Sequence, residues 1–149
     1  MNKVFSFSAI LTCLYPTLSQ AQETARFVGG DISLLPRYEQ YNTPYYTEDG
    51  ATIDDVVLYM RDVCGWNAMR VRLFVNPNAS EAKDGVVQDL AYVTALGKRI
   101  KEAGLQFLLD FPYSDTWADP VNQKLPAAWS DCKTVDQKAA RIYEYTCQS

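Results

Sequence analysis

The amino-acid sequence predicts an α/β fold that contains the first three βα units of a (β/α)8 TIM barrel. Three apolar, strand-like runs alternate with stretches whose apolar residues recur at helical spacing. The segments after the runs are long and rich in Pro, Asn, Tyr and Asp, whereas short turns lead into the second and third runs. Long loops at one end and tight turns at the other are typical of a barrel rim. Since such a barrel needs ~250 residues, we expect the fold to be incomplete in this chain of 149 residues.

The strand-like runs cover residues 26–32, 69–75 and 105–111. In the second run Arg70 and Arg72 alternate with apolar residues, so both arginines should project to one side of the strand. In the third run, residues 105–109 contain only Gln106 as a polar residue, which predicts a strand covered on both faces.

Capping patterns and helical spacing predict one helix after each run. Thr52 and Asp55 resemble a capping box that opens the first helix, and Gly65 should end it. Thr134 and Gln137 form a similar pair before the third helix. The apolar positions that we expect to share one face are Ile53, Val56, Val57, Met60 and Val63 in the first helix, Val86, Leu90, Val93, Gly97, Ile100 and Gly104 in the second, and Ala139, Ile142, Tyr143 and Thr146 in the third.

The first 21 residues are typical of a cleavable signal peptide. Lys3 precedes an apolar stretch over residues 4–18, and Ser19-Gln20-Ala21 is a small-x-small cleavage site, so the mature chain would be 22–149, beginning at Gln22. A lipoprotein attached through Cys13 is the alternative. The stretch is too short to span a membrane and Pro16 interrupts it. We therefore expect a protein exported to the periplasm or the medium, with no membrane span.

Composition excludes several classes of function. The net charge is −4 and no Lys/Arg cluster is present, which argues against nucleic acid as a partner. No histidine occurs anywhere, so Ser-His-Asp catalysis and His-ligated metals are excluded, and we expect neither a metal nor another cofactor. Cys132 and Cys147 could form a disulfide, whereas Cys64 is expected to be a small buried apolar residue.

The loop over residues 110–120 follows the third strand-like run and combines carboxylates, hydroxyls and aromatic rings. Such a combination suits a sugar, whose C–H face stacks on a ring while its hydroxyls need acceptors. Tyr113 and Trp117 are the candidates for sugar contact, although Trp117 could instead pack the loop onto Trp129. Asp110 could contact substrate directly or bond loop amides at the end of its strand.

The arginines of the second run also have two interpretations. Arg70 could bind substrate oxygens near the top of its strand, or it could form a structural ion pair with Asp31 or Asp110. For Arg72 the structural ion pair is favoured. A cluster of tyrosines after the first run could form a second aromatic wall or could simply pack: Tyr38, Tyr41, Tyr45 and Tyr46.

Three segments of the chain resemble one enzyme family. They are Gly29-Gly30-Asp31-Ile32-Ser33, the long stretch from Gly65 to Pro77, and Tyr113-Ser114-Asp115-Thr116-Trp117-Ala118-Asp119-Pro120. Together they resemble the start of the arabinogalactan endo-β-1,4-galactanases, glycoside hydrolase family 53. The resemblance implies a (β/α)8 barrel that hydrolyses β-1,4-galactan with retention, using a glutamate acid/base after strand four and a glutamate nucleophile after strand seven.

The resemblance also implies roles for individual residues. Arg70 matches an arginine on strand two beside the nucleophile, and the strand-three loop lines the galactose subsites. Two residues depart from the family pattern: Pro112 stands where the family usually has histidine, and Phe74 where it usually has tryptophan. The loss of the histidine removes a donor to bound sugar. The candidate substrate-binding residues are therefore Asp31, Arg70, Asp110, Tyr113, Ser114, Asp115 and Trp117.

Neither catalytic glutamate of the family has a matching position in this chain. Glu81, Glu102 and Glu144 lie in a predicted loop or on predicted helices. We therefore expect the acid/base and the nucleophile beyond Ser149, and residues 22–149 to be the N-terminal part of a catalytic domain that is inactive alone and monomeric when complete. The alternative is a stand-alone or vestigial galactan-binding module without catalysis.

Overall fold

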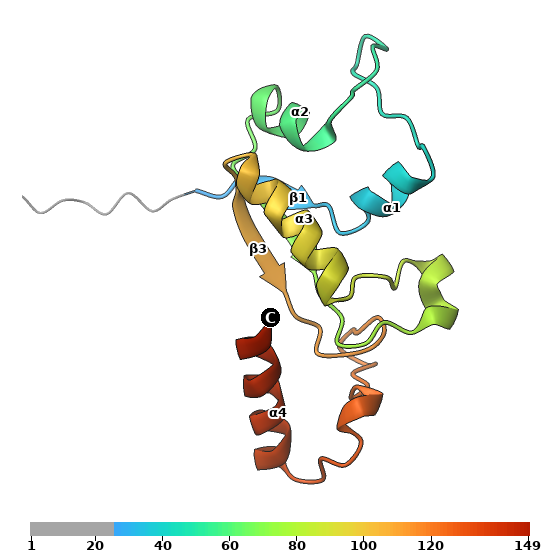
Figure 1. Ribbon diagram of the computed structural model, residues 1–149, viewed down its shortest axis with the longest axis vertical. Coiled ribbons are helices and arrows are strands. Elements are labelled where there is room, and N and C mark those ends of the chain that lie inside the picture. The colour runs from blue at the N-terminus through green and yellow to red at the C-terminus, as the bar shows by residue number, and fades with distance from the viewer. Residues whose placement is uncertain (1–25) are drawn as a thin grey trace, which may run out of the picture.

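The computed structural model describes residues 26–149, so the expected signal peptide and Cys13 lie outside the described residues. Three parallel strands form one sheet in the order β1-β2-β3, as the alternation of runs and helices predicted (Figure 1). The strands are β1 Gly29–Asp31, β2 Ala68–Arg72 and β3 Gln106–Asp110. The α-helices are α1 Leu35–Gln40, α2 Val56–Asp62, α3 Leu90–Glu102 and α4 Val135–Gln148, and two short 3-10 helices are η1 Ala79–Asp84 and η2 Ala127–Trp129.

The core lies between the sheet and the helices α2 and α3. Met69, Val71 and Leu73, from β2 and the residue after it, are fully buried. They pack in one cluster with Val93, Leu96 and Ile100 of α3. Fully burying one such side chain contributes roughly 1.5–3 kcal/mol to the stability of the fold. This face of β2 is therefore a main source of stability for the sheet and its helices.

The opposite face of the sheet carries Arg70 and Arg72, as strand alternation predicted. Leu108 of β3 pairs in register with Arg70 and therefore lies on the same face. Its side chain is 58% exposed, so the prediction that β3 is covered on both faces is wrong for the described residues. The reason is that α3 covers the face with Phe107, while the face with Leu108 is the one that a closed barrel turns inward.

The first predicted helix starts later than its capping pattern suggested. Helix α2 begins at Val56, and the side chain of Asp55 accepts the N–H of Leu58 at 3.1 Å. Thr52 is not the cap, because it pairs with Tyr46 in an isolated antiparallel bridge. Helix α2 ends at Asp62, three residues before the predicted Gly65, whose φ of +70° is a left-handed conformation that glycine adopts without strain.

Helix α3 also begins later than predicted, with Asp89 as its N-cap. Val86 precedes the helix and is buried in the connecting loop. Gly97 allows close packing on the sheet, since a Cβ there would lie 3.3 Å from the ring of Phe107. Of the predicted stripe, Val93, Gly97 and Ile100 are buried, whereas Leu90 is exposed and Gly104 follows the end of the helix.

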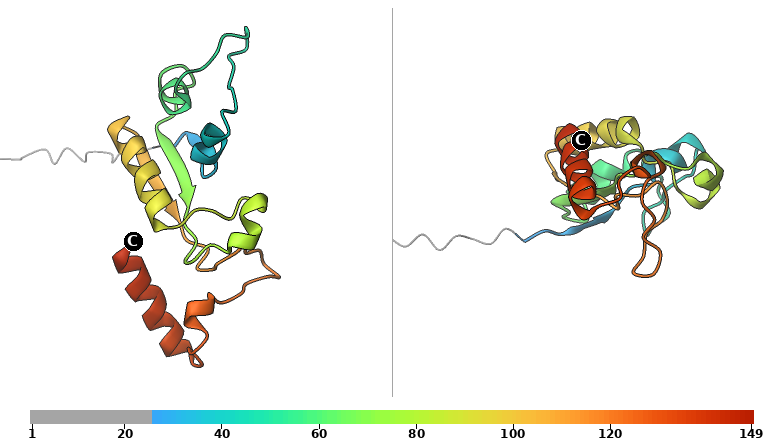
Figure 2. Two further views of the ribbon diagram at one scale, coloured as in Figure 1. Left: turned by 45° about the vertical axis from the view of Figure 1, so that its right-hand side comes forward. Right: turned by 90° about the horizontal axis from the view of Figure 1, so that it is seen from below.

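Helix α4 lies beyond the carboxyl ends of the strands rather than beside α3, as Figure 1 and the left view of Figure 2 show. Its capping box of Thr134 and Gln137 is present as predicted. Tyr143, expected on its apolar face, is 73% exposed. Tyr145 makes the contact instead, and its hydroxyl donates to the carbonyl of Phe74 at 3.0 Å.

The three cysteines in the described part of the chain are free thiols. The predicted pairing of Cys132 with Cys147 is therefore absent from this structure. Cys64 is exposed, contrary to the expectation of a buried residue, because it follows the end of α2 in the turn at Gly65. Among residues 26–149, none of the helices has the length and apolarity needed to cross a membrane.

Candidate functional site

Four charged side chains meet at the carboxyl ends of the three strands. This charge array consists of Asp31 at the end of β1, Arg70 and Arg72 on β2, and Asp110 at the end of β3. Arg70 bridges the two carboxylates, with one guanidinium nitrogen on Asp31 and the other on Asp110. Arg72 lies 3.1 Å from Asp31 and 3.9 Å from Asp110. The ion pair considered for Arg70 therefore forms with both partners at once.

Ser33 forms hydrogen bonds to two residues of the charge array. Its backbone N–H donates to Oδ1 of Asp31 at 2.9 Å, and its hydroxyl accepts the backbone N–H of Arg72 at 2.9 Å. Its carbonyl accepts the hydroxyl of Tyr92 at 2.8 Å and the amide of Gln88 at 3.2 Å. Burial raises the pKa of Tyr92 to about 12, so this phenol keeps its proton and its hydrogen bond. Ser33 was not among the predicted site residues, although it belongs to the family-like segment from Gly29 to Ser33.

The electrostatics of the array favour an ionised Asp31. Burial raises the pKa of this carboxyl, but the hydrogen bonds from Ser33 and the charges of Arg72 and Arg70 outweigh it, so the pKa lies below its ordinary value. A carboxyl with a lowered pKa is a poor proton donor at neutral pH. Asp31 is therefore suited to hold arginines and accept hydroxyls rather than to act as a general acid.

Trp117 is attached to the array through Arg72. The guanidinium carbon of Arg72 lies 4.4 Å from the centroid of the indole, a cation–π contact. Phe74 meets the same indole edge-on, with centroids 5.8 Å apart, and the indole N–H donates to the carbonyl of Asp84 at 3.0 Å. The suggested packing of Trp117 onto Trp129 is not what the structure shows, because Trp129 instead packs against Tyr113 and Tyr145.

Asp115 ties three loop segments together. One carboxylate oxygen accepts the backbone N–H of Asn76 at 3.0 Å, and the other accepts that of Ala127 at 2.8 Å. The neighbouring Ser114 is buried, and its carbonyl accepts the N–H of Val75 at 2.9 Å. The bonding of loop amides that was considered for Asp110 is thus made by Asp115. Both oxygens of Asp115 are engaged, and the Ser114 hydroxyl does not reach solvent.

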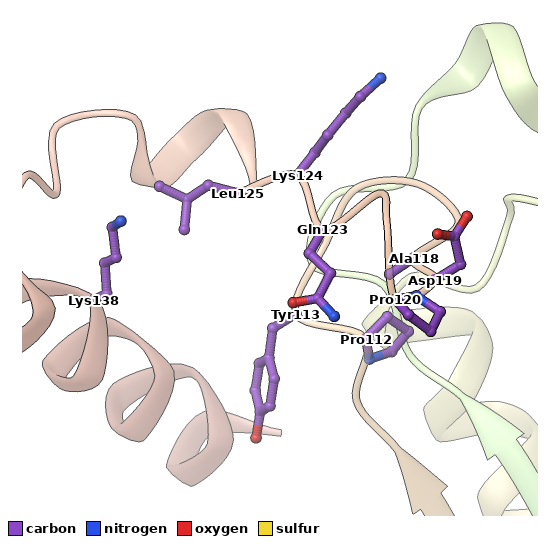
Figure 3. A pocket seen from close by; sticks show the side chains of 9 residues that line it. All are labelled: Pro112, Tyr113, Ala118, Asp119, Pro120, Gln123, Lys124, Leu125 and Lys138. Carbon is purple, nitrogen blue, oxygen red and sulfur yellow. The ribbon is translucent and has the colours of Figure 1, made fainter.

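Tyr113 points away from the charge array, toward α4. Its ring stacks on Phe111 with centroids 5.2 Å apart, and its hydroxyl lies 3.0 Å from that of Thr146 on α4. Pro112 and Tyr113, together with Lys138 of α4, border an open hollow of about 660 Å³ (Figure 3). Figure 3 shows the Tyr113 ring projecting from its loop into the space beside α4.

The structure divides the candidate residues into three groups. Asp31, Arg70 and Asp110 meet in the charge array, and Trp117 joins them through Arg72. Ser114 and Asp115 brace the loop, and Tyr113 lies at the α4 side. The array can donate and accept hydrogen bonds and has aromatic surface beside it, which suits a polyhydroxylated ligand.

Comparison with known proteins identifies the family. The sequence profile of glycosyl hydrolase family 53 matches residues 27–149. An arabinogalactan endo-beta-1,4-galactanase of Cellvibrio japonicus is 33% identical over 97% of this chain and 36% of its own length. An endo-beta-1,4-galactanase of Bacillus subtilis is 35% identical over 81% of this chain and 28% of its own length. This chain therefore spans about a third of these relatives.

A solved structure of fungal beta-1,4-galactanases superimposes with a TM-score of 0.65 at 36% identity, covering 79% of this chain and 32% of the fungal one. The described residues are therefore three βα units of a (β/α)8 barrel, and the family resemblance inferred from the motifs is confirmed. The chain belongs to glycosyl hydrolase family 53.

Proposed function

We propose that this chain is part of a secreted glycoside hydrolase that cleaves β-1,4-galactan with retention, and that it supplies one wall of the galactan-binding cleft. The observation that carries the proposal is the charge array at the carboxyl ends of β1, β2 and β3, in a chain whose relatives are named galactanases. Barrel enzymes bind and transform their substrates at this end of the strands.

Within this proposal the substrate-binding residues have different parts. Arg70 and Asp110 are 38% and 35% exposed at their side chains, so both can reach a sugar hydroxyl while paired. Trp117 is 41% exposed and adds apolar surface beside Arg72. Asp115 and Ser114 act on substrate indirectly, by holding the loop that carries Trp117.

The chain is proposed to bind without performing the cleavage. Retaining glycosidases need two carboxyl groups about 5–5.5 Å apart, one as acid/base and one as nucleophile. In the array Asp31 and Asp110 are both engaged by Arg70, and Asp31 has a lowered pKa. Neither matches the catalytic glutamates that the family places after strands four and seven, so we assign both catalytic roles to residues outside this chain.

A grafted enzyme tests the proposal. Residues 27–149 replace the matching part of the Cellvibrio japonicus relative, and release of reducing ends from β-1,4-galactan is measured. We expect the graft to hydrolyse galactan, and Arg70→Met to lower its kcat/KM by about 100-fold or more, because an electrostatic contact to reacting sugar is lost. Arg141→Met, on the surface of α4, serves as the control and should leave kcat/KM unchanged.

The outcomes separate the two interpretations of this chain. A folded graft that neither binds nor cleaves galactan would contradict the proposal. Galactan binding by the isolated chain, combined with an inactive graft, would instead support a binding module without catalysis. For an active graft, ¹H NMR of the first product should show the β anomer, as retention requires. For export, N-terminal sequencing of the secreted protein should begin at Gln22.

A further inference from the structure

A second hollow is lined in part by Asp31 and Arg72 of the charge array and shares no lining residue with the hollow of Figure 3. It has a volume of about 420 Å³, which is in the range of small-molecule sites. This Tyr38 hollow is bordered by Tyr38 and Tyr45, by the apolar side chains of Leu34 and Leu35, and by Asp31, Arg72 and Trp117. Tyr38 lies on α1, which directly follows β1 (Figure 1).

The lining combines aromatic rings and aliphatic side chains, Ile32 and Val56 among them, with few polar groups. Tyr38 is 44% exposed, so part of its side chain is open to solvent, whereas Tyr45 is partly buried and packs against the core. Flat apolar rings beside hydroxyl groups match the two sides of a pyranose, its C–H face and its hydroxyls. The residues that line the hollow are therefore of the types that bind sugars.

The charges at the hollow balance one another. Asp31 and Arg72 are paired at 3.1 Å, and Arg72 also covers the indole of Trp117. A ligand with its own net charge would have to compete with this pair, whereas a neutral ligand would not. The lining therefore favours a neutral sugar over a uronate or a phosphorylated one.

The two tyrosines that border the hollow bring two phenol groups to it. Neither the Tyr38 nor the Tyr45 hydroxyl bonds to another residue in the described part of the chain, whereas the indole N–H of Trp117 is already used by Asp84. Burial, with Glu39 and Tyr38 nearby, raises the pKa of Tyr45, so its phenol remains protonated at neutral pH. Each hydroxyl can therefore donate to one sugar oxygen and accept from another.

We propose that the Tyr38 hollow is an accessory subsite that holds one neutral galactose unit of the galactan chain beside the charge array. The proposal rests on the proposed function, since it assumes that galactan reaches this end of the strands. It separates the four tyrosines that follow β1: Tyr38 and Tyr45 border the hollow, whereas Tyr41 and Tyr46 are exposed and do not.

Titration of the full chain with β-1,4-galactotetraose tests the subsite, with dissociation constants measured by NMR or calorimetry. We expect Tyr38→Ala to weaken binding about tenfold, through loss of an aromatic contact and a hydroxyl. Tyr45→Phe, which removes a single oxygen, should weaken it about three- to tenfold. Tyr41→Ala is the matched control, because Tyr41 is 65% exposed outside the hollow, and it should bind like the wild type.

The variants are first checked by thermal unfolding, and Tyr38→Phe replaces Tyr38→Ala if the latter is not folded. Wild-type affinity in both Tyr38 and Tyr45 variants would overturn the subsite and leave the proposed function intact. The same would follow if the chain failed to bind the tetrasaccharide while the grafted enzyme still cleaved galactan. An equal loss in Tyr41→Ala would also overturn it. Failure of both binding and cleavage would overturn the subsite together with the proposed function.

Discussion

The guanidinium of Arg72 lies over the ring of Trp117, 4.4 Å from its centroid, and joins β2 to the loop that follows β3. Arg72 also contacts Asp31 at 3.1 Å, so one side chain connects the aromatic surface to the carboxylates of the charge array. Part of the Trp117 surface is therefore already covered by a protein group. Trp117 has two tasks, to hold Arg72 in place and to offer its remaining surface to a ligand.

Replacing Trp117 separates these tasks. Trp117→Ala removes the cation–π contact and the hydrogen bond to Asp84, so the free energy of unfolding in urea should fall by about 1–2 kcal/mol. Affinity for galactotetraose should fall as well. Trp117→Phe keeps an aromatic ring beside Arg72, so its free energy of unfolding and its affinity for galactotetraose should fall less. If the stability and the galactotetraose affinity of Trp117→Ala equal those of the wild type, the indole neither holds Arg72 in place nor contacts the ligand.

Arg70 should be the most important cation of the array for stability. Arg70→Met removes the two close ion pairs and leaves Asp31 and Asp110 with only their contacts to Arg72, so we expect a loss of about 1–3 kcal/mol in the free energy of unfolding. Arg141→Met removes surface pairs on α4 and should cost less than about 1 kcal/mol. Equal losses in the two variants would show that the array is no stronger than an ordinary surface pair.

Stability should decrease in acid because the pKa of Asp31 is lowered in the folded chain. A lowered folded-state pKa stabilises the fold above the unfolded-state value of about 3.9, and this stabilisation is lost as the pH falls through the folded-state value. Asp55, which caps α2 and contacts Arg99, also has a lowered pKa and adds to the effect. Urea unfolding should give constant stability from about pH 5 to 7 and a decrease below about pH 4. The variant Asp31→Asn should show a smaller decrease, and a profile like that of the wild type would contradict this assignment.

Asp115 should affect the loops more than the sheet. Asp115→Ala leaves the amides of Asn76 and Ala127 without their acceptor, with an expected cost of about 1–3 kcal/mol. Hydrogen exchange should become faster at these two amides, while the core strand residues Met69 and Val71 stay protected. Asp119→Ala, in an exposed turn of the same loop, is the control. Unchanged exchange at Asn76 and Ala127 would show that Asp115 does not brace the loops.

The local sequence pattern was sufficient for much of the fold. Alternation placed Arg70 and Arg72 on one face of β2, and the pair of Thr134 and Gln137 correctly marked the start of α4. The pattern failed at Thr52, where a contact with Tyr46 in the preceding loop overrode the local capping signal. It failed at Leu108 as well, because apolar character does not say which face another element covers.

For the site, the sequence alone determined which residue types stand at the strand ends. It also determined the family to which the chain belongs. Only the tertiary structure decided their partners. The parallel register brings Asp31, Arg70 and Asp110 together. The path of the loop after β3 brings Trp117 into contact with Arg72 and turns Tyr113 toward α4. These contacts join residues far apart in the chain, and their geometry depends on register and loop path, which local propensities and spacing do not encode.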